Sequence, residues 1–176
     1  MTSRRLILVA SVCGIVLWTV FAQLNHYLSS WHVSLFIGGL LVVFPALRLN
    51  YRDGWKIVVL LGLWFDATAP VRFGLHAVLF LAAHTFIFNL RARFPREETY
   101  FGILVALIAN AAIFLVLTLG LIVRHPAPLG ALPAIFLDLF ISELFVALAA
   151  GWFFSLQEHA LEIAGFSLRH ERRGLL

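Results

Sequence analysis

The stretch Gly62-Leu-Trp-Phe-Asp66-Ala-Thr-Ala-Pro70-Val-Arg72-Phe-Gly74-Leu-His76 places ionisable and helix-breaking residues between two strongly apolar runs. An aspartate at the centre of a membrane helix costs about 2.5 to 3.5 kcal/mol, so Asp66 needs a partner or a function. Pro70 ends a helix, and Gly74 can take a positive φ or allow close packing. Gly62 lies one helical turn before Asp66 and would let a neighbouring backbone approach closely. The stretch therefore predicts a tight helical hairpin.

The composition predicts that the two runs belong to a protein solvated by lipid. Of the 176 residues 62% are hydrophobic, and the mean hydropathy is +0.96. Charged residues make up 12%, about half the roughly 25% usual in soluble domains. A core of this size cannot hide so much apolar surface. The length predicts a single domain, the lone Cys13 excludes an intramolecular disulfide, and the net charge of +4 fits arginines flanking membrane spans better than nucleic-acid binding.

Six apolar segments predict an all-α integral membrane bundle of six transmembrane helices. The first is expected to be an uncleaved helix, although its basic start resembles a signal peptide. A crossing takes about 20 residues, so the third segment is expected to be short and to tilt, thin the bilayer or end in buried non-helical backbone. The segments run over residues 6–24, 31–47, 57–67, 74–90, 100–123 and 132–156.

The boundaries of these segments divide the chain into two parts. Residues 1–156 are expected to form the transmembrane domain. Residues 157–176 mix charged and apolar side chains and are expected to form a cytoplasmic tail, either an amphipathic interfacial helix or a partly disordered segment.

The basic residues predict the orientation, because loops on the cytoplasmic side carry an excess of lysine and arginine. If the N-terminus is cytoplasmic, only Arg72 and Arg124 of the thirteen basic residues lie outside. This asymmetry requires an even number of crossings. It therefore supports counting the third segment as a crossing and predicts that both termini are cytoplasmic.

Asp66, Arg72 and His76 are the first candidate site residues, and each allows two interpretations. Asp66 is either a packing group, bonded to Thr68 or to backbone amides of the reversal, or an acid that binds a partner or lines a pocket. Arg72 either pairs with Asp66 or meets lipid phosphate. His76 is either a satisfied packing residue or a ligand or partner contact.

The sixth segment carries two further acids, Asp138 and Glu143. Five residues separate them, which puts them about 140° apart on a helix, so they do not form one carboxylate pair. A helix with two acids should bury both in protein or a cavity. Ser142 could bond near Asp138, and Asn110 in the fifth segment is expected to bond between helices.

Metal binding, a cofactor and catalysis are not predicted. His76 and His84 are eight residues apart and share no metal-binding face, and no other ligand cluster is present. An intramembrane aspartyl protease would need Asp66 and Asp138 to face each other and share a proton. The asparagine-containing motifs that surround the aspartates of lipoprotein signal peptidases do not occur around either residue.

The motif Leu61-Gly-Leu-Trp-Phe-Asp66, followed by Pro70 and by Gly74-Leu-His76, resembles the rod shape-determining protein MreD family. That family has an apolar run ending in Gly-Leu-x-x-Asp, a short turn, and then Gly-Leu-His before another apolar helix. The specific motif covers about 16 residues here, whereas the expected topology covers most of the chain. The chain departs from the family by having Arg72 where a proline is common, and it lacks the usual Ser-Gly of the turn.

The resemblance implies a noncatalytic part of the bacterial cell-wall elongation (rod) complex in the inner membrane. Such a protein would control cell shape by binding MreC and linking MreB filaments to peptidoglycan synthesis by RodA and its transpeptidase. Its bundle would be similar to the substrate-binding subunits of vitamin transporters. The alternative function is therefore a small-molecule-binding transporter subunit, with Asp66, Arg72 and Glu143 lining a pocket.

Overall fold

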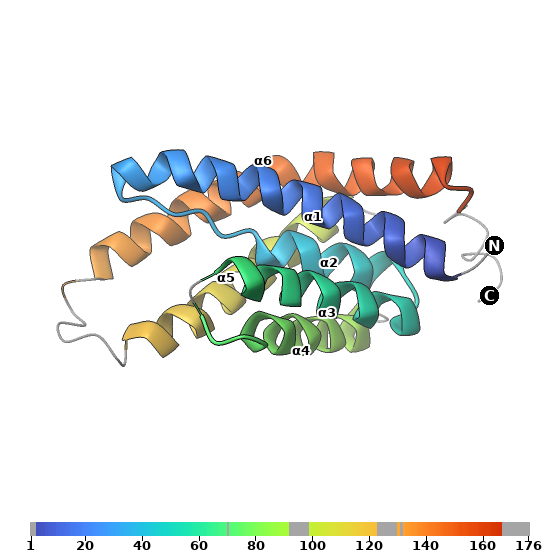
Figure 1. The fold of residues 1–176 in the computed structure, drawn as a ribbon, viewed down its shortest axis with the longest axis horizontal. Helices are drawn as coiled ribbons and strands as arrows, with labels where there is room; N and C mark the ends of the chain where they lie inside the picture. The colour runs from blue at the N-terminus through green and yellow to red at the C-terminus, as the bar shows by residue number, and fades with distance from the viewer. Residues whose placement is uncertain (1–2, 70, 92–98, 123–129, 131, 167–176) are drawn as a thin grey trace.

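A computed structural model describes residues 3–69, 71–91, 99–122, 130 and 132–166. Over these residues the chain is all-α, as the apolar segments predict, with a short 3-10 turn at Ser29–Trp31. Its six α-helices form one bundle (Figure 1). They are α1 (Ser3–Leu28), α2 (Gly38–Arg48), α3 (Tyr51–Thr68), α4 (Leu75–Leu90), α5 (Thr99–Ile122) and α6 (Leu132–Ile163).

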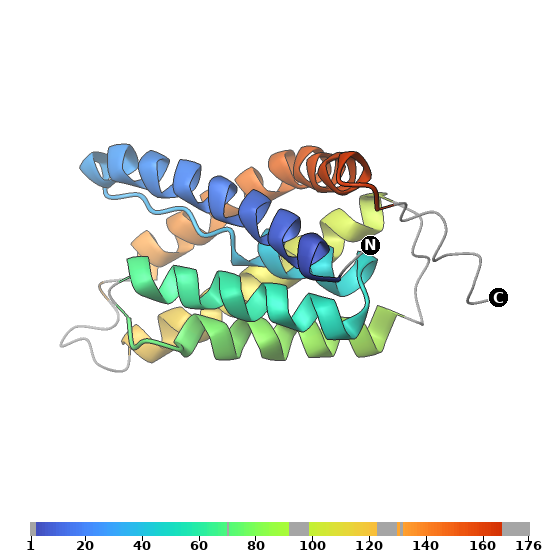
Figure 2. The same cartoon turned by 45° about the vertical axis from the view of Figure 1, so that its right-hand side comes forward.

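The helix ends gather basic residues at one end of the bundle. α1 and α3 run parallel, since Ser3 Oγ donates to Asp53 Oδ1 at their starts and Trp18 Nε1 donates to Thr68 Oγ1 further along. The start of α1 and the end of α6 lie at the same end (Figures 1 and 2). Of the seven described lysines and arginines, six belong to helix termini at this basic end, and Arg72 belongs to the α3–α4 turn at the other end. The six are Arg4, Arg5, Arg48, Arg52, Lys56 and Arg91.

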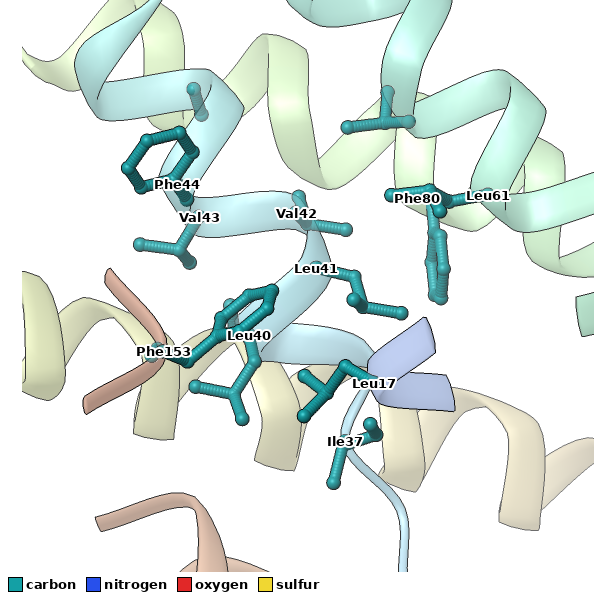
Figure 3. Close-up of a cluster of buried hydrophobic side chains, with 14 of the residues drawn as sticks. Leu17, Ile37, Leu40, Leu41, Val42, Val43, Phe44, Leu61, Phe80 and Phe153 are labelled. Atoms are coloured by element: carbon teal, nitrogen blue, oxygen red, sulfur yellow. The ribbon is translucent and has the colours of Figure 1, made fainter. Parts of the chain in front are cut away.

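α2 forms the centre of the core. Every residue from Gly38 to Ala46 is buried, and α2 packs against α3, α4, α5 and α6. Figure 3 shows its side chains meeting Leu17 of α1, Leu61 of α3, Phe80 of α4 and Phe153 of α6. A helix that is apolar on all sides is stable only when protein or lipid covers every face. Here protein covers all of them.

The expectation that the third segment is the short one is wrong. α3 has 18 residues, whereas α2 has 11. The polar residues 51–56, expected in a loop, form the first turns of α3, where Asp53 N and Gly54 N both donate to Asn50 O. Asp53 lies in the first turn, where a negative charge is favourable near the positive end of the helix dipole.

The expectation that residues 31–47 form one helix is also wrong. Residues 33–37 are non-helical, and His32 takes a positive φ of 55° where the chain turns back from α1. Two adjacent glycines, Gly38 and Gly39, disfavour extending α2 toward its N-terminus, since each is about 1 kcal/mol worse than alanine in a helix. The backbone of this stretch instead bonds to side chains of other helices.

The helices α1, α5 and α6 are long and apolar enough to cross a membrane. Large apolar side chains are exposed along them, for example Val16 of α1, Ile108 of α5 and Leu148 of α6. Exposed apolar side chains on this scale are typical of surfaces that face lipid. α6 continues to Ile163, seven residues beyond the expected end of the sixth segment, with Gln157 and Leu161 buried. The second half of the expected tail, residues 167–176, lies outside the described residues.

Candidate functional site

The carboxylate of Asp66 lies at the centre of a buried polar cluster that joins α3 to the start of α4. Its Oδ2 accepts hydrogen bonds from Gly74 N at 2.9 Å and Ala77 N at 3.3 Å, and its Oδ1 accepts one from His76 N at 3.0 Å. The side chain of Asp66 is fully buried. The first amides of a helix have no partner within it, and Asp66 supplies that partner from another helix. We call Asp66, Gly74, His76 and Ala77 the Asp66 cluster.

The imidazole of His76 completes the hydrogen bonding of this carboxylate. Its Nδ1 lies 2.9 Å from Asp66 Oδ1. A carboxylate offers only acceptors, so Nδ1 is the donor. The ring is enclosed by aromatic side chains, with centroids 5.1 Å from Phe65, 5.9 Å from Phe80 and 6.3 Å from Phe36. Aromatic rings cover the pair, which keeps water away and strengthens its hydrogen bonds.

Two glycines give this hairpin its geometry. Gly74 has φ of 95°, a conformation that glycine adopts without the strain that a Cβ brings. A Cβ on Gly62 would lie 2.7 Å from Ala77 N, which is too close for real atoms. The absence of a side chain at Gly62 therefore lets the start of α4 approach α3 closely enough for Asp66 to reach its amides. Both roles were expected from the sequence.

The remaining predicted residues of the hairpin lie elsewhere. Arg72 is exposed, and the described hydrogen bonds and ion pairs include none between Arg72 and Asp66. Thr68 does not bond to Asp66 among them either, since its hydroxyl accepts from Trp18 and donates to Phe65 O at 3.0 Å. Pro70 lies outside the described residues. Of the two interpretations of Asp66, the packing group bonded to backbone amides describes its geometry.

A second polar cluster surrounds the non-helical backbone before α2. Asp138 accepts from Ser34 N at 2.9 Å and from Ser34 Oγ at 2.7 Å. Ser142 Oγ accepts from Phe36 N at 3.0 Å. Asn25 bonds to both sides of Leu35, accepting from its N–H at 2.7 Å and donating to its C=O at 2.8 Å. We call residues 33–39 and the side chains that bond to their backbone the segment 33–39 cluster.

Asn110 of α5 forms more hydrogen bonds than any other side chain of this cluster. Its Oδ1 accepts from Gly39 N, and its Nδ2 donates to Phe36 O and to Glu143 Oε1, each at 3.0 Å. Asn110 is fully buried. The expectation that it bonds between helices is confirmed, since these contacts join α5 to α6 and to the backbone preceding α2.

Both acids of the sixth segment, Asp138 and Glu143, form hydrogen bonds within the segment 33–39 cluster. Asp138 and Glu143 lie on different faces of α6, yet both serve this one stretch, Asp138 directly and Glu143 through Asn110. Non-helical backbone at membrane depth is tolerated where protein satisfies its polar groups. The polar side chains of α1, α5 and α6 perform that role here.

Phe36 connects the two clusters. Its backbone bonds to Ser142 and Asn110, while its ring lies 6.0 Å from the ring of Phe65 and 6.3 Å from that of His76. A displacement of segment 33–39 would therefore disturb the packing around Asp66.

The chemistry available to the acids is limited by these bonds. Asp66 and Asp138 belong to different clusters and bond to different groups, so their contacts do not form the carboxylate pair that an aspartyl protease requires. Over the described part of the chain, no three His, Cys, Asp or Glu side chains gather in a way that could hold a metal ion.

Sequence reasoning missed the roles of Asn25, Ser34 and Phe36. Asn25 was expected in a short outer loop, and Ser34 and Phe36 were expected inside the helix over residues 31–47. A signal for them existed in the chain, since two polar residues flank Trp31 at the point where one apolar run gives way to the next. That pattern indicates a turn but does not identify partners on α5 and α6.

The class of protein that this structure defines is an all-α membrane-type bundle whose second helix is short and enclosed. Comparison of the chain with protein-family models, with curated proteins and with solved structures found no match. Any more specific identity therefore depends on the motif around Asp66 and on the arrangement of the helices.

Proposed function

We propose that the chain is a noncatalytic membrane scaffold of the MreD type, acting in the bacterial cell-wall elongation complex. It would lie in the inner membrane with six crossings and both termini in the cytoplasm. Through MreC it would link MreB filaments to RodA and its transpeptidase and so control cell shape.

The observation that carries the proposal is the structural role of four residues of the motif, Gly62, Asp66, Gly74 and His76. These four residues bring α3 and α4 together through one buried carboxylate and one close backbone approach. In the family that the motif resembles, the same residue types occur in the same order. A motif that builds a rigid hairpin suits a protein that presents helix surfaces to partners.

A second supporting observation is that Asp66, Asp138 and Glu143 all bond to groups within the bundle. Acids used in this way support the stability of the fold, and a scaffold needs no reactive group. The exposed apolar faces of α1 and α6 would be available to the single membrane helix of MreC.

Co-purification tests this function directly. The tagged protein, at native expression in mild detergent, is expected to retain MreC, whereas an unrelated single-span membrane protein is not retained. Depletion of the protein is expected to turn rod-shaped cells round. Absence of MreC from the wild-type eluate, together with unchanged cell shape on depletion, would reject the proposal.

The alternative function, a small-molecule-binding subunit of a transporter, is favoured by one feature. Non-helical backbone near the membrane midplane often forms transporter binding sites, and residues 33–37 are non-helical backbone between α1 and α2. Genes for an ATPase and a coupling subunit beside this one, in place of genes for cytoskeletal filaments, would support that function over the scaffold.

A further inference from the structure

We propose that the first turns of α1 and α3 form a binding surface for lipids with anionic headgroups. The surface consists of Arg4, Arg5, Arg52, Trp55 and Lys56, and we call it the basic surface. This inference needs only a bilayer around the bundle and does not depend on the proposed function.

The geometry of two parallel helices brings these cations together. The hydrogen bond between Ser3 and Asp53 joins the first turn of α1 to the first turn of α3. Arg4 and Arg52 directly follow and precede these two residues in the sequence, and both are exposed. Four cations and one acid, Asp53, lie in the first two turns of the two helices, which leaves a net charge of +3 (four positive minus one negative).

The exposed aliphatic side chains next to the cations identify a lipid as the ligand of the basic surface. On α1, Leu8 follows Arg4 by four residues and is 63% exposed; on α3, Leu60 follows Lys56 by four residues and is 48% exposed. Residues four apart are neighbours on a helix surface. Each helix therefore presents a cation and, one turn further along the helix, an exposed aliphatic side chain. This arrangement matches a lipid, whose phosphate headgroup would meet the cation and whose acyl chain would meet the aliphatic side chain.

Trp55 places the basic surface at the height of the headgroups. It is 38% exposed, and Lys56 Nζ lies 6.0 Å from the centre of its ring. Tryptophan is enriched where membrane meets water, and clusters of lysine and arginine next to a membrane helix bind anionic lipids. An acidic soluble protein would use the cations but not the aliphatic side chains below them.

Fluorescence quenching tests the proposal with the protein in lipid nanodiscs. Phosphatidylglycerol or phosphatidylcholine, each brominated near the glycerol, is added to a phosphatidylcholine background. The quenching of Trp55 is obtained as the difference between wild type and Trp55→Phe. We expect wild type to prefer phosphatidylglycerol, and the preference to fall about five-fold for each of Arg4→Gln, Arg52→Gln and Lys56→Gln.

The matched control is Arg72→Gln, which removes an exposed cation from the opposite end and is expected to leave the quenching of Trp55 unchanged. Equal quenching by the two lipids in wild type would overturn the proposal. A preference retained by the triple variant, which combines Arg4→Gln, Arg52→Gln and Lys56→Gln, would also overturn it. If the triple variant does not fold, wild type in about 1 M NaCl replaces it, because salt screens exposed charges. A preference for phosphatidylglycerol that persists at that salt concentration would contradict a headgroup site.

Discussion

The side chain of Asp66 does for α4 what an N-cap residue normally does for its own helix. Gly74, the residue at that position, has no side chain to donate or accept a bond. The acid comes instead from α3, eight residues earlier in the chain. Because the capping acid belongs to another helix, the stability of α4 depends on the contact between α3 and α4.

Asp66→Leu is expected to destabilise the bundle strongly. It would leave three amides and the imidazole of His76 buried without their acceptor, a loss of about 3 kcal/mol or more, since each unsatisfied buried group costs about 1 to 3 kcal/mol. Asp66→Asn keeps one acceptor oxygen and should lose less. Thermal unfolding in detergent measures both. Wild-type stability of Asp66→Leu with lost binding of MreC would show that the acid serves the partner and not the fold.

Gly54 and His84 are expected to show strong energetic coupling. His84 is fully buried, and its Nε2 occupies the space that a Cβ on Gly54 would need. Gly54→Ala should therefore lower the melting temperature in wild type, because the enclosed ring cannot move away. In the background of His84→Ala the same substitution should cost less, and the remaining close neighbour of that Cβ is Pro45 O at 3.1 Å. Equal losses in the two backgrounds, measured as a double-mutant cycle, would contradict the contact.

Segment 33–39 and α2 show how far side chains can replace regular backbone bonding. Residues 34–36 and Gly39 bond to side chains from three other helices. Tertiary contacts thus hold the stretch in place, and each contact should raise the free energy needed to open this segment locally.

Asn110→Leu is expected to open segment 33–39 without unfolding the whole bundle. It would leave Gly39 N and Phe36 O without partners and release Glu143. Hydrogen exchange at the amides of residues 34–39 should rise, while exchange in the last two turns of α4, away from the Asp66 cluster, should change little. The matched control is Asn89→Leu, an exposed asparagine on α4. Unchanged exchange in Asn110→Leu would contradict the assigned hydrogen bonds.

The sequence predicted the elements of this fold better than the irregular stretch. Hydropathy separated the apolar segments, and the stretch around Asp66 predicted a tight reversal. Backbone amides were one of several partners expected for Asp66. The interruption before α2 was not predictable in the same way, because apolar residues occur in helical and in buried extended backbone alike. The partners that decide between them lie far along the chain: Asp138 is 104 residues from Ser34, and Asn110 is 71 residues from Gly39.

Across the whole molecule, six of the seven described cations lie at the basic end and Arg72 lies at the other. The positive-inside rule then predicts the basic end to be cytoplasmic. That orientation implies that Arg52 and Arg72, at opposite ends of α3, are on opposite sides of the membrane.

Cysteine labelling in intact cells tests this orientation. In a Cys13→Ala background, Arg72→Cys is expected to react with a membrane-impermeant maleimide added from outside. Arg52→Cys is expected to react only after the cells are opened. Cys13→Ala alone provides the blank. Labelling of both sites from outside would reject the six-crossing arrangement.

The enclosure of α2 also has a consequence for biosynthesis. An 11-residue helix is too short to be retained in the bilayer as an independent crossing, and its covering helices α5 and α6 leave the ribosome last. Asn110, Asp138 and Ser142 cannot bond to segment 33–39 until then. Segment 33–39 therefore stays incompletely hydrogen-bonded until α5 and α6 have been synthesised, and assembly of this bundle can finish only after translation of α6.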